Sequence, residues 1–315
     1  MNYVLEQNLH FYRGRIALNA ILVGLGIGNG DEVITQAFTC VAVPESIIAA
    51  GALPVYVDIK KNGFNMDADD LVSKITSKTK AIIVQHTYGI PADMDRIMDI
   101  ANEINIPIIE DCCHTFDSMY KGKKVGTFGV ASFYSYEWGK PLVLGVGGSA
   151  FINDEKLYKI IVSNYTSYNG PSRLKVLRII AQYFGYKLLY KPAFYWKLKT
   201  LFHFLSSLKI AEGNYYDSSS KNQKILADYN LKMSNYHKKL LSSKFTKMKK
   251  NKNVSQNIAI NYFRLITSEK VVHPNINSAI KEIVLIRYPL ITNNKSEILI
   301  KAKKQKIEIS DWYMT

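Results

Sequence analysis

The sequence predicts an α/β protein whose mostly parallel sheet is covered by helices on both faces. Short, fully apolar runs alternate with helical segments over the first half of the chain, and this alternation is typical of parallel strands joined by helical crossovers. The chain has 315 residues, of which 47% are hydrophobic and 21% charged. Such a composition suits a globular protein that buries a sizeable core.

The predicted elements follow one another in a regular order. The expected strands are Glu32–Thr35, Pro54–Ile59, Lys80–His86, Pro107–Asp111, Val130–Tyr136 and Gly148–Ile152. The expected helices are Ala17–Val23, Val43–Ala50, Ala68–Thr76 and Met94–Ile104. Because functional residues in such sheets sit at the carboxyl ends of strands, the residues that close these strands are the first candidates for a site.

Four glycines, Gly24, Gly26, Gly28 and Gly30, follow the first expected helix. A dinucleotide-binding loop needs G-x-G-x-x-G directly after a strand, whereas these glycines follow a helix with a different spacing. We interpret them as a helix C-cap and a turn.

Three regions of different character divide the chain. We expect a large α/β domain over residues 1–165, a basic, aromatic-rich helical insertion over 166–225 and a smaller C-terminal α/β domain over 226–315. The last region is expected to hold a Lys-rich helix, a strand at Glu282–Pro289, a helix at Ser296–Lys304 and a strand at Ile307–Ser310.

The insertion has a one-sided charge. Residues 173–209 contain no acidic residue and eight basic ones: Arg173, Lys175, Arg178, Lys187, Lys191, Lys197, Lys199 and Lys209. Basic charge interleaved with aromatic and aliphatic bulk is what a helix at a membrane surface needs. Aromatic residues at helical spacing are also common in a lobe that packs on the core or on a second subunit. Both interpretations stay open at this point.

Composition limits the other function classes. The formal net charge is +15, but no nucleic-acid-binding motif is present, so we expect no nucleic-acid partner. The three cysteines, Cys40, Cys112 and Cys113, are too few for a disulfide framework and indicate a reducing, cytoplasmic compartment. We find no signal peptide and no apolar stretch long enough to span a bilayer.

Three sites along the chain could carry chemistry. Asp111 closes an apolar run, and a carboxylate at the mouth of a buried sheet needs a cationic partner or a structural role such as helix capping. Lys140 stands between an apolar strand and a Gly-rich turn, where a lysine can attack a carbonyl or simply be exposed. Gly14 and Arg15 open a helix whose N-terminal amides could hold a phosphate. A phosphate anchor, an acid and a downstream lysine are together what pyridoxal phosphate (PLP) requires.

Longer stretches of the sequence make the prediction of a PLP enzyme more specific. In order and spacing the chain resembles the DegT/DnrJ/StrS family of PLP-dependent sugar aminotransferases over about residues 11–165, with a weaker match from Asp228 into Arg287-Tyr-Pro. The stretches that carry the resemblance are Gly28-Asn-Gly-Asp-Glu-Val-Ile, Ala37-Phe-Thr-Cys-Val-Ala, Ala50-Gly-Ala-Leu-Pro-Val-Tyr-Val-Asp-Ile, Lys78-Thr-Lys-Ala-Ile-Ile-Val-Gln-His-Thr-Tyr-Gly, Pro91-Ala-Asp-Met-Asp, Ile109-Glu-Asp-Cys-Cys-His, and Lys140-Pro-Leu with Gly145-Val-Gly-Gly. The resemblance implies the PLP-dependent transferase fold of type I.

The resemblance also implies roles for three central residues. Lys140 would bind the cofactor as a Schiff base and then move a proton between the substrate carbon and the cofactor. Asp111 would keep the pyridine nitrogen protonated. His114 would lie beside the 3′-oxygen of the cofactor. No metal is implied.

Further positions match the family's cofactor-binding residues. Ser135 and the Gly14–Arg15 turn would bind the phosphate. Asn230 would reach the phosphate of the partner subunit's cofactor, so the resemblance implies a homodimer. Cys40 occupies the place where many members stack an aromatic ring on the cofactor.

The chain departs from the family pattern at several places. Arg13 replaces a small residue, Glu137-Trp-Gly precedes Lys140 in place of more common residues, and Lys232 stands where arginine is usual. The N-terminal arm is short and the family pattern extends beyond Thr315.

The implied function is transfer of an amino group, from glutamate, to a nucleotide-linked keto sugar in surface polysaccharide or glycan biosynthesis. Dehydratases of the family resemble the pattern with histidine in place of Lys140, so the lysine argues against that activity. The alternative is a non-catalytic or truncated member that binds PLP or a membrane surface without turnover. The expected location is cytoplasmic, with peripheral contact at the inner membrane face through residues 173–209.

Overall fold

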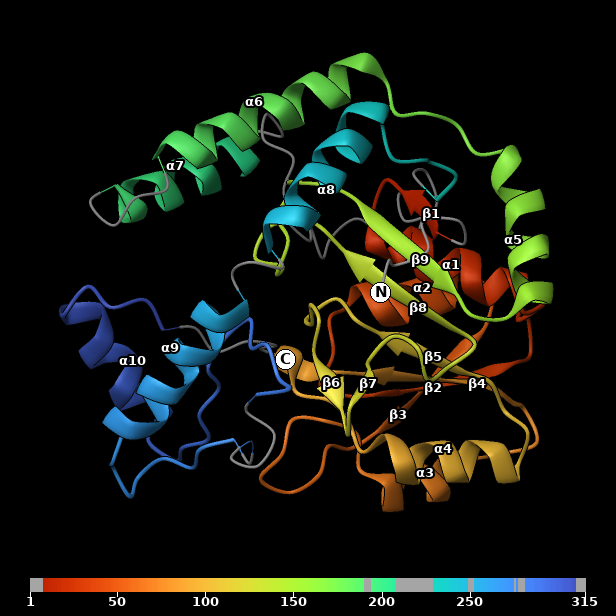
Figure 1. Cartoon of the computed structure of the whole chain (residues 1–315), viewed down its shortest axis with the longest axis horizontal. Helices are drawn as coiled ribbons and strands as arrows, with labels where there is room; N and C mark the ends of the chain where they lie inside the picture. The colour runs from red at the N-terminus through yellow and green to blue at the C-terminus, as the bar shows by residue number, and fades with distance from the viewer. Residues whose placement is uncertain are drawn as a thin grey trace.

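A seven-stranded sheet lies at the centre of the molecule (Figure 1). This computed structural model describes residues 8–189, 194–207, 229–248, 252–274, 276 and 281–309. The strand order is β1-β9-β8-β5-β4-β2-β3, with the strands β1 (Asn8–Phe11), β2 (Glu32–Gln36), β3 (Leu53–Val57), β4 (Thr79–Gln85), β5 (Ile108–Asp111), β8 (Ala131–Ser135) and β9 (Gly148–Ile152). The pairings from β3 to β8 are all parallel, whereas β9 runs antiparallel to both of its neighbours. The expected mostly parallel sheet is confirmed.

Helices cover both faces of the sheet, as the sequence predicts. One face packs against α1 (Gly14–Gly24), α2 (Ala42–Ala49) and α5 (Glu155–Thr166), and the other against α3 (Ala68–Lys74) and α4 (Met94–Glu103). In Figure 1, α3 and α4 lie below the sheet. A short hairpin of β6 (Met119–Tyr120) and β7 (Lys123–Lys124) and a single 3₁₀ turn, η2 (Thr87–Gly89), complete this region.

The strand β4 shows why the predicted strands are apolar at successive positions and do not alternate with polar residues. Ala81 and Ile83 belong to the core cluster with α1, α2 and α5. Ile82 and Val84 belong to the cluster with α3 and α4. Since successive side chains of a strand point to opposite faces, a strand covered on both faces must be apolar at every position.

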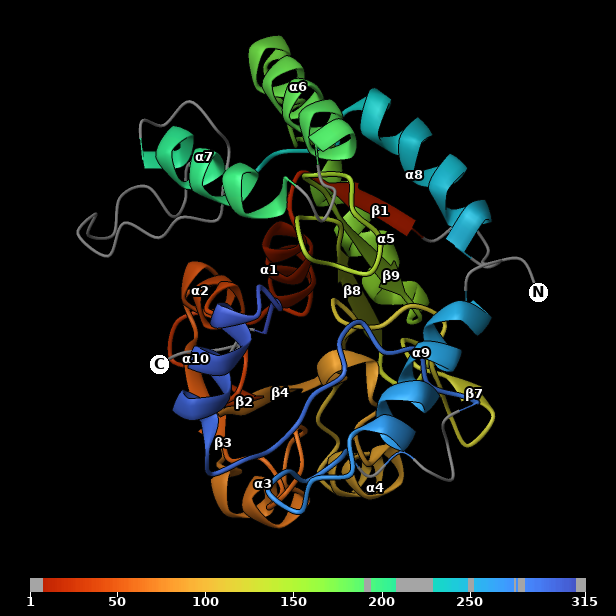
Figure 2. The same ribbon diagram turned by 90° about the vertical axis from the view of Figure 1, so that its left-hand side faces the viewer.

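The predicted helical insertion forms a lobe above the sheet. Its described helices are α6 (Arg173–Leu189) and α7 (Tyr195–Ser207), and α8 (Asn235–Met248) follows the return of the chain. Figures 1 and 2 both show α6 at the opposite end of the molecule from α4. No helix in the described parts of the chain combines the length and apolarity needed to cross a bilayer.

The lobe leaves and rejoins the rest of the protein at one place. The amide of Asn169 donates to the carbonyl of Asn230 at 2.8 Å, and the amide of Lys232 donates to the carbonyl of Asn169 at 2.8 Å. The segment also lies against β1, because the amide of Tyr12 donates to the carbonyl of Leu231 at 3.0 Å. The expected boundary between residues 225 and 226 lies outside the described residues, and the division into three domains stays a prediction.

The C-terminal region differs from the expected α/β pattern. Its described helices are α9 (Lys252–Leu265) and α10 (Lys295–Lys304), and the second confirms the predicted helix at Ser296–Lys304. The predicted strand at Glu282–Pro289 is wrong, since this stretch is irregular. Residues 307–309 are also irregular, and Ser310 lies outside the described residues.

Hydrogen bonds to loops explain why Glu282–Pro289 forms no strand. The carbonyl of Glu282 accepts from the Met119 amide at 2.8 Å, and the amide of Ile286 donates to the Tyr88 carbonyl at 3.0 Å. The amide of Val284 donates to the hydroxyl of Ser118 at 3.0 Å. Because single hydrogen bonds to Met119 of β6, to Ser118 and to Tyr88 of η2 pair its backbone groups, the stretch crosses the carboxyl edge of the sheet without forming a strand ladder.

Candidate active site

Polar side chains collect at the carboxyl ends of the parallel strands. Asp111 is the last residue of β5, Ser135 is the last residue of β8, and Lys140 follows β8 on a turn. In open parallel sheets this edge is where ligands bind. The positions that the sequence singles out therefore lie at the expected edge.

Asp111 is a buried carboxylate, with only 4% of its surface exposed. Its Oδ1 accepts a hydrogen bond from the Cys113 amide at 2.9 Å. Burial raises the pKa of the Asp111 carboxyl, and the Cys113 amide and the charge of Lys140 oppose that rise. A cationic N–H placed against Asp111 would stabilise its charged form, so the residue suits a protonated pyridine nitrogen.

His114 is buried beside this acid. Its ring is nearly parallel to that of Tyr88, with an interplanar angle of 13° and centroids 6.1 Å apart. Burial, followed by the charges of Lys140 and Arg287, lowers the pKa of His114 well below its usual value. The imidazole is therefore neutral at physiological pH.

Lys140 is half-buried on a tight loop between β8 and β9. Its amide donates to the carbonyl of Glu137 at 3.3 Å, and the amide of Leu144 donates to the carbonyl of Tyr136 at 2.8 Å. The charge of Lys140 acts on both Asp111 and His114. The three residues to which the resemblance assigns the central chemistry thus follow the carboxyl ends of two paired parallel strands, β5 and β8.

Gly14 and Ser135 meet at the start of α1. A Cβ atom added to Gly14 would lie 2.9 Å from the Ser135 Cβ and 3.2 Å from the Tyr134 carbonyl oxygen. The residue that precedes the helix, Arg13, makes no side-chain cap hydrogen bond to the first turn. An uncapped helix N-terminus beside a hydroxyl is a suitable place for a phosphate group.

An ion pair flanks this corner, and the sequence analysis did not predict it. Arg13 Nη1 and Glu137 Oε1 are 2.6 Å apart, and the Ser135 hydroxyl donates to Glu137 Oε2 at 3.4 Å. In the sequence, Arg13 and Glu137 are two separate departures from the family pattern. The opposite charges of Arg13 and Glu137 are the one feature of the sequence that could have predicted this ion pair.

The side chain of Arg15 does not face this corner. Its Nη1 pairs with Glu45 Oε2 on α2 at 2.8 Å. Burial raises the pKa of Glu45, and the Arg15 charge opposes the rise. Any part of Arg15 in phosphate binding therefore belongs to its backbone amide in the first turn of α1.

Cys40 and Asn230 lie in separate parts of the structure, and neither is buried as Asp111 and His114 are. Cys40 is half-buried on the loop between β2 and α2, where the neighbouring Thr39 hydroxyl donates to Gln85 Oε1 at the end of β4 at 2.6 Å. Asn230 is exposed on the segment that returns from the lobe. Its place on the surface leaves its side chain accessible to a second subunit.

Arg287 is a third residue, after Arg13 and Glu137, that sequence reasoning did not assign to the site. A Cβ atom added to Gly139 would lie 3.5 Å from Arg287 Nη2, and the Arg287 charge lowers the pKa of His114. The irregular stretch that carries Arg287 thus brings a cation next to the Lys140 loop. Only the fold could show this, since 147 positions separate Arg287 from Lys140 in the chain.

His86, Glu110 and Cys112 form the one group in the described residues whose atoms could hold a metal, all within 4.8 Å. Protein hydrogen bonds already engage the His86 ring and the Glu110 carboxylate. The Ala92 amide donates to His86 Nδ1 at 3.2 Å, so Nε2 carries the proton and donates to Glu110 Oε2 at 3.0 Å. Glu110 also accepts from three amides, those of Gly126, Phe128 and Gly129. We assign this cluster a structural role in holding β5.

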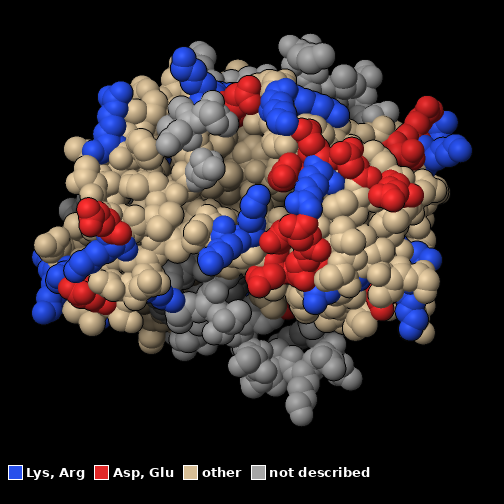
Figure 3. All heavy atoms as spheres, turned by 90° about the horizontal axis from the view of Figure 1, so that it is seen from below, with Lys and Arg blue, Asp and Glu red and all other residues tan. Residues whose placement is uncertain are grey.

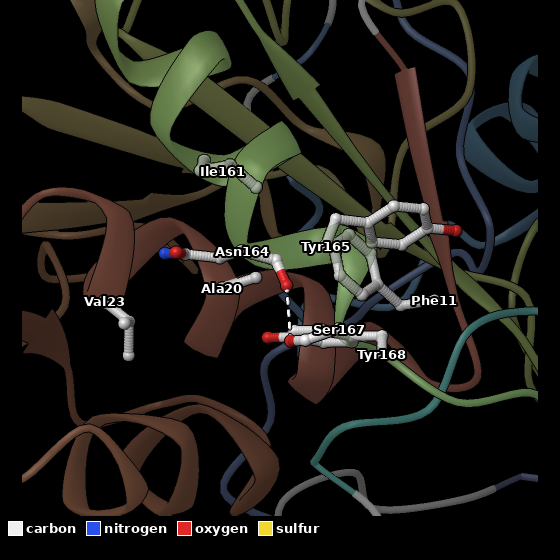
Figure 4. Close-up of a pocket in the computed structure, with 8 residues that line it drawn as sticks. All are labelled: Phe11, Ala20, Val23, Ile161, Asn164, Tyr165, Ser167 and Tyr168. Atoms are coloured by element: carbon white, nitrogen blue, oxygen red, sulfur yellow. Dashed lines mark hydrogen bonds between the residues drawn. The ribbon is translucent and has the colours of Figure 1, made fainter.

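A pocket of about 280 Å³ lies elsewhere, between β1, α1 and α5 (Figure 4). Its lining residues are Phe11, Ala20, Val23, Ile161, Asn164, Tyr165, Ser167 and Tyr168. Figure 4 shows mostly apolar and aromatic side chains around it, with the Ser167 hydroxyl bonded to the Asn164 carbonyl at 2.7 Å. None of the residues predicted for the site lines this pocket.

The mostly parallel sheet with helices on both faces has the PLP-dependent transferase fold of type I, the fold of the solved aminotransferases to which this chain is similar. The chain belongs to the DegT/DnrJ/EryC1/StrS aminotransferase family, whose model matches residues 11–315. This confirms the resemblance and the fold class that the sequence predicts.

Individual relatives agree with this membership. The chain is 44% identical to a GDP-perosamine synthase of Escherichia coli O157:H7 over 145 residues, which are 46% of this chain and 40% of that protein. It shows the same identity and coverage with a UDP-2-acetamido-2-deoxy-3-oxo-D-glucuronate aminotransferase of Pseudomonas aeruginosa. The matched region thus spans about two fifths of the length of these relatives. A solved structure of NtdA from Bacillus subtilis, with bound cofactor PMP, has a TM-score of 0.66 at 20% identity, covering 97% of this chain and 60% of that one.

Proposed function

We propose that the protein is a PLP-dependent aminotransferase in which Lys140 carries the cofactor. The observation that supports this most is the placement of Asp111, His114 and Lys140 just beyond the carboxyl ends of the neighbouring parallel strands β5 and β8. Bound PLP supplies an electron sink for the bonds of an amino-bearing carbon.

Each residue of the site has a task in this proposal. The Lys140 amine would hold the cofactor and would move the proton at the substrate carbon. The buried carboxylate of Asp111 accepts the hydrogen bond of the pyridine nitrogen and keeps that nitrogen protonated. His114, held neutral, would lie beside the 3′-oxygen of the cofactor. The Gly14 amide and the Ser135 hydroxyl hold the phosphate.

For the substrates we propose glutamate as the amino donor and a nucleotide-linked keto sugar as the acceptor. Two relatives are named for GDP- and UDP-linked sugars. The guanidinium of Arg287, next to the Lys140 loop, suits the anionic groups that both substrates carry. The product would enter surface polysaccharide or glycan biosynthesis.

We propose a homodimer as the active unit. The exposed side chain of Asn230 would reach the phosphate of the cofactor bound by the partner subunit. A cytoplasmic location agrees with the three cysteines of the chain being unpaired thiols.

The first test is an absorbance spectrum of the full chain with PLP, before and after addition of glutamate. We expect a band of protein-bound PLP that disappears with glutamate and never forms in Lys140→Ala. Lys156→Ala, which removes an exposed lysine on α5, should keep the band. Glutamine in place of glutamate tests the donor.

Two other outcomes of the absorbance test would contradict parts of the proposal. A folded protein that shows no band with PLP would contradict the aminotransferase proposal and favour the non-catalytic alternative. A band that survives in Lys140→Ala would show that another amine binds the cofactor. Mass analysis of a GDP- or UDP-linked keto sugar after incubation then tests the acceptor.

A further inference from the structure

The helix α6 presents apolar residues to solvent along one stripe. Leu174, Leu177, Phe184 and Leu188 are 58%, 62%, 49% and 68% exposed. They recur at intervals of three, seven and four residues, so on a helix with about 3.6 residues per turn they lie within one stripe of about 80°. We call this set the α6 stripe.

The other side of α6 is the side that packs on the protein. Ile179 and Tyr183 are buried there, and Ile179 belongs to the core around α1 and α5. The α6 stripe lies on the opposite side of the helix from both. The helix is thus apolar on two faces, of which the described part of the chain covers one.

Basic residues border the α6 stripe on both sides. At about 100° per residue, Arg178 lies next to one edge, and Arg173 and Lys187 lie next to the other. All three are exposed. Apolar residues flanked by cations, with no acidic residue between positions 173 and 209, are the pattern of a helix that lies in the plane of a membrane surface.

The helix α7 repeats this arrangement. Phe194, Leu201 and Phe204 are exposed, and with the exposed Lys197 they recur every three or four residues on one face. Two successive helices of the lobe therefore present apolar and basic residues without acidic ones.

The charge distribution differs on the opposite side of the molecule. Figure 3 shows the molecule from below, the side of α3 and α4, where acidic and basic side chains are interspersed. Arg96 pairs there with Asp69, and Lys121 with Asp95. The one-sided charge is thus a property of the lobe and does not follow from the overall charge of +15.

We propose that the α6 stripe and the exposed face of α7 dock on an anionic lipid bilayer. A second copy of this chain is a poorer occupant, because a two-fold interface would bring together the basic borders of two stripes with no acidic residue of 173–209 to pair with them. Anionic headgroups match the basic border, and the acyl boundary accepts the apolar stripe.

Docking would bring the candidate active site close to the bilayer. The inner face of α6 packs on the loop of Lys140, since the rings of Trp138 and Tyr186 have centroids 4.9 Å apart. A Cβ atom added to Gly145 would lie 3.0 Å from Trp138 and 3.3 Å from Ile179. One helix diameter, about 10 Å, then separates this loop from the lipid.

Vesicle sedimentation of the full chain tests the proposal without the cofactor. We expect the protein to bind vesicles of phosphatidylcholine mixed with phosphatidylglycerol at low salt, and to be released by high salt or by omission of phosphatidylglycerol. The triple variant Arg173→Gln/Arg178→Gln/Lys187→Gln should lower the partition coefficient by roughly 100-fold. The control Lys60→Gln/Lys61→Gln/Lys78→Gln changes the net charge equally on exposed residues elsewhere and should bind nearly as wild type does.

A second pair of variants tests the apolar part. Leu177→Asp/Leu188→Asp should lower binding by at least about 10-fold, whereas Val72→Asp, at an exposed position of α3, should not. Equal binding to vesicles with and without phosphatidylglycerol, or an equal loss in the control triple variant, would overturn the proposal. So would a dimer that dissociates only in Leu177→Asp/Leu188→Asp, because the stripe would then be a subunit interface. A failure of this test leaves the absorbance test of Lys140 unaffected.

Discussion

At the scale of single residues, His237 of α8 is a buried imidazole that the protein keeps neutral. Only 2% of the residue is exposed, its Nε2 has no hydrogen-bond partner within the described chain, and burial lowers its pKa from 6.5 to about 4. Between these two values the unfolded chain binds more protons than the folded one, so stability must fall as the pH falls through this range.

Denaturation at pH 7 and pH 5 measures this effect. We expect the free energy of unfolding to fall by roughly 1–2 kcal/mol from His237 alone. His237→Leu should lose less stability than wild type over the same interval. His10, whose pKa burial and Lys238 lower to about 4, should keep part of the dependence in the variant. An identical loss in both proteins would contradict the assignment to His237.

The positions of site residues could be predicted from sequence where the end of a strand decides them, whereas their roles stay predictions that the family resemblance implies. Asp111 closes an apolar run and Lys140 precedes a Gly-rich turn, and both lie at the predicted edge of the sheet. The Arg13–Glu137 pair and the approach of Arg287 depend on contacts between distant segments. No local pattern encodes such contacts, so the fold had to be known first.

At the scale of elements, the start of α1 is pressed against β9. A Cβ atom added to Gly148 would lie 2.4 Å from the Gly14 amide nitrogen and 2.5 Å from the Arg13 carbonyl carbon. These are backbone atoms, which cannot turn aside as a flexible side chain can. The glycine therefore permits the helix N-terminus to reach Ser135.

We expect Gly148→Ala to destabilise the protein by about 3 kcal/mol or more. Gly185→Ala is the matched control, because nothing lies within 4 Å of the added Cβ on α6 and alanine favours a helix interior by up to about 1 kcal/mol. Thermal unfolding should show a lower midpoint for the first variant and an equal or higher one for the second. An unchanged midpoint in Gly148→Ala would mean that α1 can move away from β9 at little cost.

Element predictions succeeded where burial on both faces imposes a pattern and failed where it does not. The apolar runs that became β4 and β5 have helices on either side. The stretch Glu282–Pro289 is similarly apolar but lies over loops that satisfy its backbone. Apolar content alone does not show whether a neighbouring strand is present to pair with.

At the scale of the whole molecule, the proposed dimer makes a prediction about mixed subunits. If Asn230 serves the partner's cofactor, a dimer of one Lys140→Ala and one Asn230→Ala subunit contains one intact site. Co-expression of the two variants should then restore up to about a quarter of the wild-type activity at limiting PLP, since half of the dimers are mixed and each has one such site.

Asp111 provides the control for this experiment. Asp111 and Lys140 lie in the site of one subunit, so Lys140→Ala combined with Asp111→Ala leaves no intact site in any dimer. Their mixture should stay inactive. Activity of the Lys140→Ala and Asn230→Ala mixture no higher than that of the separate variants would contradict the role of Asn230 across the interface.

The junction at Asn169 has a consequence for how genes of this kind can change. The chain enters and leaves the lobe where Asn169 is hydrogen-bonded to Asn230 and Lys232. An in-frame gain or loss of the codons for 170–229 would therefore join two residues that are already neighbours, and would keep Asn230. The strand order and the ends of β5 and β8 would be unaffected. Trp138 contacts α6, so loss of the lobe would expose its ring and favour a more polar residue at that position. The block can therefore be exchanged during evolution as a unit, separately from the residues of the sheet edge.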